Sequence, residues 1–271
     1  MFSNDVSIVL LIGRRINILL TNLIKFYTKM FIPSIKNVIY NYLRKRGLMI
    51  APLPNGFSLN PNTEWIKEYK FDTILDVGAN YGQFAKFINK LFPESNIYSF
   101  EPIKECFDKL IPNNPEIINY KVFNYALGDD NTIQEFYKNE FTASSSLLPM
   151  EDEHIKNFPF TKNTSIEKVT VKKLDDIYKL LNIGKKVLLK IDVQGFEDKV
   201  IDGGISFIKT FSPMLIIETS FVRLYKNESL FEDIYDRLKK LDYYYIGNLD
   251  QLFSPLNGAI LQGDAIFIKK T

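Results

Sequence analysis

Four short apolar segments of this chain each end in a carboxylate, and these acids are the residues best placed to do chemistry. They are Asp76, Glu101, Asp192 and Glu218. If the segments are neighbouring parallel strands, their carboxyl ends meet at one sheet edge, where ligands of such sheets bind. Four anions there repel one another, so we expect a cationic or hydrogen-bond-donating ligand among them. The alternative is that some of them cap the helices that follow.

The first of these acids opens a glycine-containing loop, residues 76–82, which reads G-x-N-x-G from Gly78 to Gly82. Small residues let the backbone approach a bound nucleoside, and Glu101 follows about 20 residues later, where an acid holds ribose hydroxyls. A dinucleotide site prefers G-x-G-x-x-G, and an acid beside its pyrophosphate is unfavourable. The loop therefore favours S-adenosylmethionine, which carries sulfonium and ammonium charges, over NAD.

Seven motifs in chain order resemble those of the FkbM-type methyltransferases and span about residues 70–270. They are residues 76–82, 99–102, 124–129, 144–147, 171–175, 189–197 and 216–218. The resemblance implies an α/β, Rossmann-like class I fold, with a mostly parallel seven-stranded sheet and helices on both faces. It also implies O-methylation of hydroxyls on sugars, glycans or related metabolites, with S-adenosylmethionine as the methyl donor.

The resemblance also assigns residues to the cofactor. These are Asp76, Gly78, Asn80 and Gly82 in the loop, Glu101 at the ribose, and Asn124 and Ala126 beside the adenine. Asp192 ends the strand expected next to the first one, which places it with the cofactor, close to the methyl group. Family members usually carry glutamate where this chain has Gln194. That difference weakens any role of position 194 as a base or metal ligand.

Methyl transfer to a hydroxyl needs a group that receives the proton, and Asp192 is our first candidate. Lys190 lies two residues earlier on the same strand and projects to the same face. A buried lysine is costly unless it is paired, so we expect a Lys190–carboxylate pair. Lys190 is a second catalytic candidate, although a purely structural ion pair is the favoured interpretation. For Asp192 the alternative is a helix N-cap.

Acceptor contacts are expected from Ser145, Ser146, Glu197 and Glu218, although the serines also fit a simple turn. The acids could instead bind Mg²⁺ with Asp192, but nothing in the sequence requires a metal. The single histidine, His154, lies in a polar segment, and we expect a solvated loop side chain rather than a general base.

Short apolar runs alternate with amphipathic ones after residue 60, as in parallel βαβ units. Strands are expected at 73–77, 97–101, 117–123, 187–192, 214–218, 243–246 and 265–269, and helices at 63–69, 82–91, 104–110, 197–208 and 230–241. The methyltransferase domain is predicted to span 63–271, after a turn-rich linker at 51–62.

Residues 1–50 form a basic, apolar arm, with eight Lys and Arg side chains against Asp5 alone. Its apolar runs are too short to span a bilayer, which takes roughly 20 residues. We expect a helix that packs on its own domain or on a partner subunit, or that contacts a membrane surface. One cysteine, Cys106, fits a reducing, cytoplasmic compartment. If the arm contacts a membrane, we expect a peripheral location at its inner face.

Three classes of function stay open. The first is a methyltransferase acting on a hydroxyl of a small molecule or of a free or lipid-linked glycan. The second is an enzyme that uses NAD or a nucleotide sugar, and the third is an inert, membrane-peripheral binding module. A nucleic-acid partner is not expected, because the chain beyond residue 50 is net acidic and lacks a basic stripe. Nothing in the sequence decides whether the chain forms oligomers.

Overall fold

The computed structural model describes residues 61–270. Seven strands form the main sheet, and their order is that of a class I methyltransferase, in which the chain switches sides after its first three strands. The order is β3 (Tyr120–Phe123), β2 (Asn96–Phe100), β1 (Thr73–Val77), β7 (Val187–Ile191), β8 (Met214–Ser220), β10 (Ile260–Lys269) and β9 (Tyr243–Phe253). The first five strands pair in parallel, and β10 is antiparallel to both β8 and β9. The sheet is therefore the mostly parallel, seven-stranded sheet that the resemblance implies.

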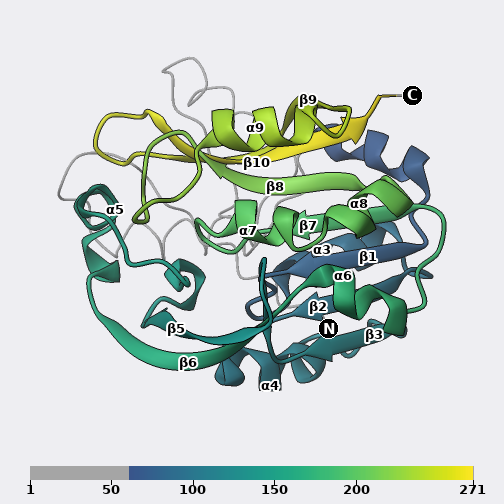
Figure 1. The fold of residues 1–271 in the computed structure, drawn as a ribbon, viewed down its shortest axis with the longest axis horizontal. Helices are drawn as coiled ribbons and strands as arrows, with labels where there is room; N and C mark the ends of the chain where they lie inside the picture. The colour runs from purple at the N-terminus through teal and green to yellow at the C-terminus, as the bar shows by residue number, and fades with distance from the viewer. Residues whose placement is uncertain (1–60, 271) are drawn as a thin grey trace, which may run out of the picture. The chain divides into compact units, whose positions relative to one another are not determined.

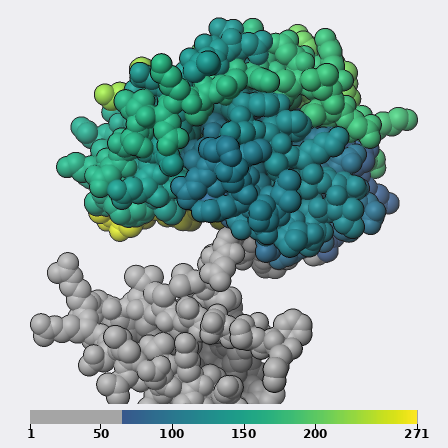
Figure 2. Space-filling model, turned by 90° about the horizontal axis from the view of Figure 1, so that it is seen from below, coloured from purple at the N-terminus to yellow at the C-terminus, as the bar shows by residue number. Residues whose placement is uncertain are grey.

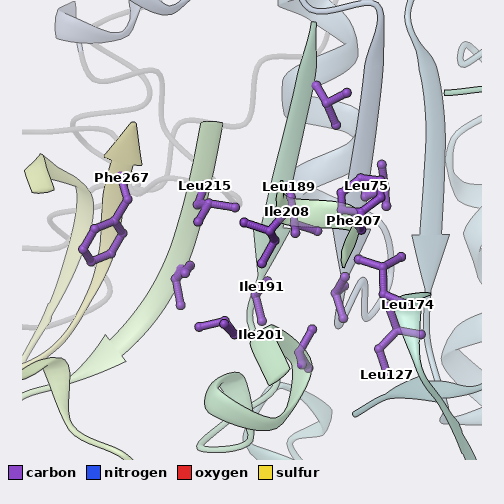
Figure 3. Close-up of a cluster of buried hydrophobic side chains, with 14 of the residues drawn as sticks. Leu75, Leu127, Leu174, Leu189, Ile191, Ile201, Phe207, Ile208, Leu215 and Phe267 are labelled. Carbon is purple, nitrogen blue, oxygen red and sulfur yellow. The ribbon is translucent and has the colours of Figure 1, made fainter. Parts of the chain in front are cut away.

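Helices cover both faces of this sheet. They are η1 (Pro61–Tyr69), α3 (Gln83–Leu91), α4 (Lys104–Asn113), α6 (Leu174–Ile177), η4 (Tyr178–Leu180), α7 (Glu197–Asp202), α8 (Ile205–Phe211) and α9 (Phe231–Lys239). On one face, alternate strand residues such as Leu189 pack against Phe207 of α8 (Figure 3). On the other face, the ammonium group of Lys190 lies 5.3 Å from the ring centre of Phe84 in α3. Successive residues of a strand point to opposite faces, so the two helices lie on opposite sides of β7.

A second, three-stranded sheet was not predicted. It consists of β4 (Ala126–Leu127), β6 (Thr164–Lys172) and β5 (Thr132–Asn139), in that order, and the chain between β5 and β6 forms η2 (Thr142–Ser144), α5 (Asp152–Asn157) and η3 (Pro159–Thr161). In Figure 1 this insertion lies to the left of β7 and β8, beyond their carboxyl ends. Its core packs on α4, where Cys106 joins Phe136 and Val169. Figure 2 shows the surface of the described residues from another side, with the teal and green middle of the chain on its left.

The predicted helix over 197–208 is two helices, α7 and α8. The break falls at Gly203 and Gly204, and a Cβ on Gly203 would lie 1.8 Å from the carbonyl oxygen of Gly128. The chain therefore turns where it must pass close to the backbone of another segment. The predicted strand at 117–123 begins only at Tyr120, and the two last strands are longer than expected.

The basic arm, residues 1–50, and most of the linker lie outside the described residues. Within residues 61–270, no helix combines the length and the apolar character that crossing a bilayer requires.

Candidate active site

A cavity of about 380 Å³ lies at the carboxyl edge of the main sheet. Its walls come from the segments that follow β1, β2 and β7, from residues of β8, β9 and β10, and from the inserted small sheet with its connecting segment. Predicted site residues on these walls are Gly78, Asn80, Glu101, Ala126, Ser145, Asp192 and Glu218. The edge where strand order reverses, between β1 and β7, is thus where the cavity opens, as expected for an open α/β sheet.

The loop after β1 has a left-handed backbone at every second residue. The φ angles are +81° at Gly78, +49° at Asn80 and +85° at Gly82. Glycine and asparagine are the residues that adopt this region most readily. A Cβ on Gly78 would also lie 1.8 Å from the carbonyl oxygen of Asp192, so this position requires glycine. The G-x-N-x-G spacing therefore follows from backbone geometry and from close contact with the loop after β7.

Glu101 holds that loop from the neighbouring strand. Its two carboxylate oxygens accept the backbone N–H groups of Asn80 and Ile103, each at 2.7 Å. Burial raises the pKa of Glu101 to about 7, although both hydrogen bonds oppose the rise. Each oxygen keeps a second lone pair, so the carboxylate can also accept hydrogen bonds from ligand hydroxyls.

Lys190 is fully enclosed beneath the cavity and confirms the expected lysine–carboxylate pairing. Its Nζ atom lies 2.9 Å from Oδ2 of Asp192 and 3.8 Å from Oδ1 of Asp76. Burial alone lowers the pKa of Lys190, but the negative charges of Asp192 and Asp76 outweigh it and raise the pKa. The strand register places Asp76 directly opposite Lys190, so the pairing of β1 with β7 brings these charges together.

Gln194 bridges the carboxylates of Asp192 and Glu218. Its amide Nε2 donates to Oδ1 of Asp192 at 2.9 Å and also to Glu218, while its Oε1 accepts the hydroxyl of Tyr225 at 2.9 Å. Gln262 donates to the same oxygen of Glu218 at 3.0 Å. Burial, and then the charge of Asp192, raise the pKa of Glu218 well above its usual range. An amide at position 194 supplies two donors where a carboxylate would add a third negative charge.

Several predicted residues lie behind the cavity wall. Asp76 is enclosed below it, and Asn124 donates to the carbonyl oxygens of Glu101 and Pro102, which braces the loop after β2. Ser146 donates to the carbonyl oxygen of Gln194 at 2.6 Å. A side chain on Gly82 would meet that of Asn114.

Glu197 also points away from the cavity. Its carboxylate accepts the backbone N–H groups of Val193 and Gly195 and so fixes the loop after β7. Burial raises the pKa of Glu197 to about 8 despite these hydrogen bonds.

The expectation that His154 is a solvated loop side chain is wrong. His154 lies in α5, is 3% exposed and lines the cavity. Its ring packs edge-on against Phe158 and Tyr225, and burial lowers its pKa to about 4. The polar residues 151–153 suggested solvent, but the chain turns this one helical residue inward against two aromatic rings.

Three phenylalanines complete the outer wall and were not predicted from the sequence. They are Phe141, Phe158 and Phe160, all within the insertion between β5 and β6. The sequence gives no signal for them, because residues 141–160 are about as rich in Phe, Trp and Tyr as the chain as a whole. Among residues 61–270, no three His, Cys, Asp or Glu side chains stand close enough together to hold a metal ion.

Comparison with known proteins identifies the family. The model of the methyltransferase FkbM domain matches residues 76–245, more than half of the chain. Among curated proteins, the chain is 25% identical to the 2-O-methyltransferase NoeI of Sinorhizobium fredii, over 62% of this chain and 72% of NoeI. It is 27% identical to the methyltransferase sdnD of Sordaria araneosa, over 48% of this chain and 59% of sdnD.

Solved methyltransferase structures are also similar to this chain. An rRNA methylase from Streptococcus thermophilus aligns with a TM-score of 0.43 at 10% identity, covering 81% of this chain and all of that one (100%). A SAM-dependent methyltransferase from Aquifex aeolicus aligns at 0.38 and 11%, covering 76% and 88%. On the family match, the chain belongs to the FkbM methyltransferases and is an S-adenosylmethionine-dependent enzyme.

Proposed function

We propose that this FkbM methyltransferase transfers a methyl group to a hydroxyl of a sugar, a glycan or a related hydroxylated metabolite. The observation that carries the proposal is the Asp192 carboxylate, which lines the cavity and is 24% exposed while Lys190 and Gln194 hold its two oxygens. Such a carboxylate is oriented to accept a proton from an incoming hydroxyl. The likeness to a relative named as a 2-O-methyltransferase supports transfer to oxygen.

The residues around the cavity fit S-adenosylmethionine. The carboxylate of Glu101 lies just after β2, where ribose hydroxyls can donate hydrogen bonds to it. Gly78 has no side chain, so a ligand can approach the backbone of the loop closely. Asp192 supplies negative charge that suits the sulfonium group, and Glu218 adds a second carboxyl group to the same wall. When bound, the cofactor supplies an electrophilic methyl group.

The protein's own contribution is to position the acceptor and to receive its proton. Asp192 is the proposed proton acceptor, because each of its oxygens keeps a lone pair beyond the bonds from Lys190 and Gln194. Proton transfer to a positioned base typically contributes 10²–10⁴-fold to a rate, and orientation of the reacting groups raises the rate further. Lys190 stays protonated and balances the charge of Asp192 from below.

Cofactor binding tests the cofactor half of this proposal. We expect S-adenosylhomocysteine to bind the wild type about tenfold more tightly at pH 8 than at pH 6, because the pKa of Glu101 is about 7 and the ionised carboxylate accepts the ribose hydroxyls. The variant Glu101→Gln should bind more weakly, with no such pH dependence. Isothermal titration measures both, and Glu105→Gln on exposed α4 is the control. Binding of NAD but not of S-adenosylhomocysteine would contradict the proposal.

Asp192→Asn tests the catalytic half. It should bind S-adenosylhomocysteine within about threefold of the wild type but transfer methyl groups about 100-fold more slowly to any acceptor that the wild type methylates. Equal turnover by the two proteins would show that Asp192 is not the base.

We further propose that residues 1–50 hold the enzyme at an anionic membrane surface, near lipid-linked acceptors. The support is the charge of this arm, +7, against −5 for the rest of the chain. Full-length protein should float with anionic vesicles but not with neutral ones, and glutamates in place of Arg14, Arg15, Lys25 and Lys29 should abolish flotation. Flotation that is independent of lipid charge would count against the tether.

A further inference from the structure

We propose that Phe141 and Phe160 form a platform, at the mouth of the cavity, for one ring of a neutral carbohydrate acceptor. The inference rests on the proposed function and adds the binding site and the charge class of the acceptor. Phe141 and Phe160 are 52% and 63% exposed, yet both line the cavity. Large exposed aromatic side chains that border a cavity are typical of ligand sites.

The two rings form a fixed pair. Their centres lie 5.5 Å apart with an angle of 87° between the planes, and Phe158 packs edge-on behind Phe160 at 6.2 Å. Aromatic pairs favour this edge-to-face arrangement. It leaves an aromatic face free at the mouth, and the C–H groups of a pyranose ring can pack on such a face through weak C–H contacts.

A buried asparagine holds the two segments that carry the rings. Asn139 is 1% exposed; its Oδ1 accepts the backbone N–H of Phe141 at 2.8 Å, and its Nδ2 donates to the carbonyl oxygen of Thr161. Its own backbone N–H donates to Oγ of Ser145 at 2.9 Å. One side chain therefore connects the segment before Phe141 with the one after Phe160, so the platform is built into the fold.

The platform is joined directly to the loop assigned to the cofactor. The hydroxyl of Thr142, next to Phe141, donates to Oδ1 of Asn80 at 3.0 Å. The hydroxyl of Tyr225 lies 3.1 Å from the carbonyl oxygen of Ser144 and 2.9 Å from Gln194, which holds Asp192. A ring on the platform thus lies in the same cavity as the proposed base.

The charges of the cavity select a neutral acceptor. Among the described residues that line it there is no Lys or Arg, whereas Glu101, Asp192 and Glu218 are acidic. A phosphate or uronate group entering this cavity would meet the carboxylate of Asp192, with no Lys or Arg side chain on the walls to pair with. Hydroxyls instead find acceptors and donors in Asp192 and Ser145.

Saturation-transfer NMR on full-length protein loaded with S-adenosylhomocysteine tests the platform. The probes are methyl glycosides of neutral hexoses, with the matching uronic acids and hexose phosphates. We expect binding of neutral glycosides only, and a loss of about threefold to tenfold in affinity for Phe141→Ala and for Phe160→Ala. The control is Tyr244→Ala, whose side chain is 43% exposed near the start of β9, at the opposite edge of the sheet.

Three results would overturn the inference. The first is unchanged glycoside binding in both phenylalanine variants. The second is that the wild type binds the anionic sugars as well as the neutral ones, and the third is that it binds none of the probes. In each case titration of S-adenosylhomocysteine into unloaded samples of the same proteins separates this failure from failure of the proposed function. If the wild type binds S-adenosylhomocysteine normally, the methyltransferase assignment stands and only the platform is excluded.

Discussion

The two halves of the cavity are built by different means. The half formed by the main sheet consists of buried charges and tight backbone turns, with Lys190 among carboxylates and Gly78 against the backbone of Asp192. The half formed by the insertion between β5 and β6 consists of exposed phenylalanines and one neutral histidine, His154. The first half is thus built into the core of the fold, whereas the second is an added wall.

This difference separates stability from specificity. Changes in the sheet half should damage folding and cofactor binding together, since the same atoms serve both. Changes in the insertion should alter acceptor binding and leave the sheet intact, because its exposed aromatic rings contribute little to the core. The following predictions test this separation, beginning with the largest effect.

Gly78→Ala should have the largest effect. The new Cβ would overlap the carbonyl oxygen of Asp192, and we expect a loss of more than about 4 kcal/mol in unfolding free energy, together with loss of S-adenosylhomocysteine binding. Gly258→Ala is the matched control, because its φ of +77° is similar but no atom lies within 4 Å of the new Cβ. That control should cost only about 1–2 kcal/mol. Chemical denaturation measures both, and equal losses would refute steric contact as the cause.

Lys190→Met should be nearly as damaging. Removing the ammonium group leaves Asp76 and Asp192 without their buried cation, which we expect to cost about 3–5 kcal/mol. Adding Asp76→Asn should restore part of the loss, because it removes one of the two uncompensated charges. Lys86→Met, whose exposed pair with Glu116 spans 3.7 Å, should cost less than about 1 kcal/mol. If the double variant is less stable than Lys190→Met, the ion pair is not the source of the effect.

The smallest expected effect is a difference in pH dependence between the two halves. The pKa of His154 is lowered to about 4, so its contribution to stability is present above pH 6.5 and lost as the pH falls toward 4. His154→Phe should remove up to about 3 kcal/mol of this dependence. The pKa of Glu197 is raised to about 8, so stability falls as the pH rises from 4.5 to 8, and Glu197→Gln should remove that opposite slope. Denaturation from pH 4 to 8 distinguishes the two, and slopes of the same sign would contradict the assignment.

Much of the sheet half could be predicted from the sequence. The strands at 73–77, 187–192 and 214–218 are confirmed almost to the residue, because each is a short apolar run that ends at an acid. The α7–α8 break was missed because it depends on how closely Gly203 approaches Gly128, two residues far apart in the chain.

The small sheet was missed for a related reason. Strand β5 is mostly polar and only partly buried, and its partner β6 begins 25 residues after β5 ends. No local period marks such a strand as part of the site, because its pairing is settled by a partner far along the chain. The same holds for Asn139, whose bond to Thr161 becomes visible only when the two segments meet.

What the sequence by itself determined is the local chemistry: the acids at strand ends, the G-x-N-x-G loop and the lysine that must be paired. Each follows from residues within one strand and its turn, where backbone sterics and charge burial act over a few positions. Only the tertiary structure decided the rest. It turned His154 inward, placed Gln194 between two carboxylates and brought Phe141 to Phe160, because burial and contact depend on segments that are distant in the chain.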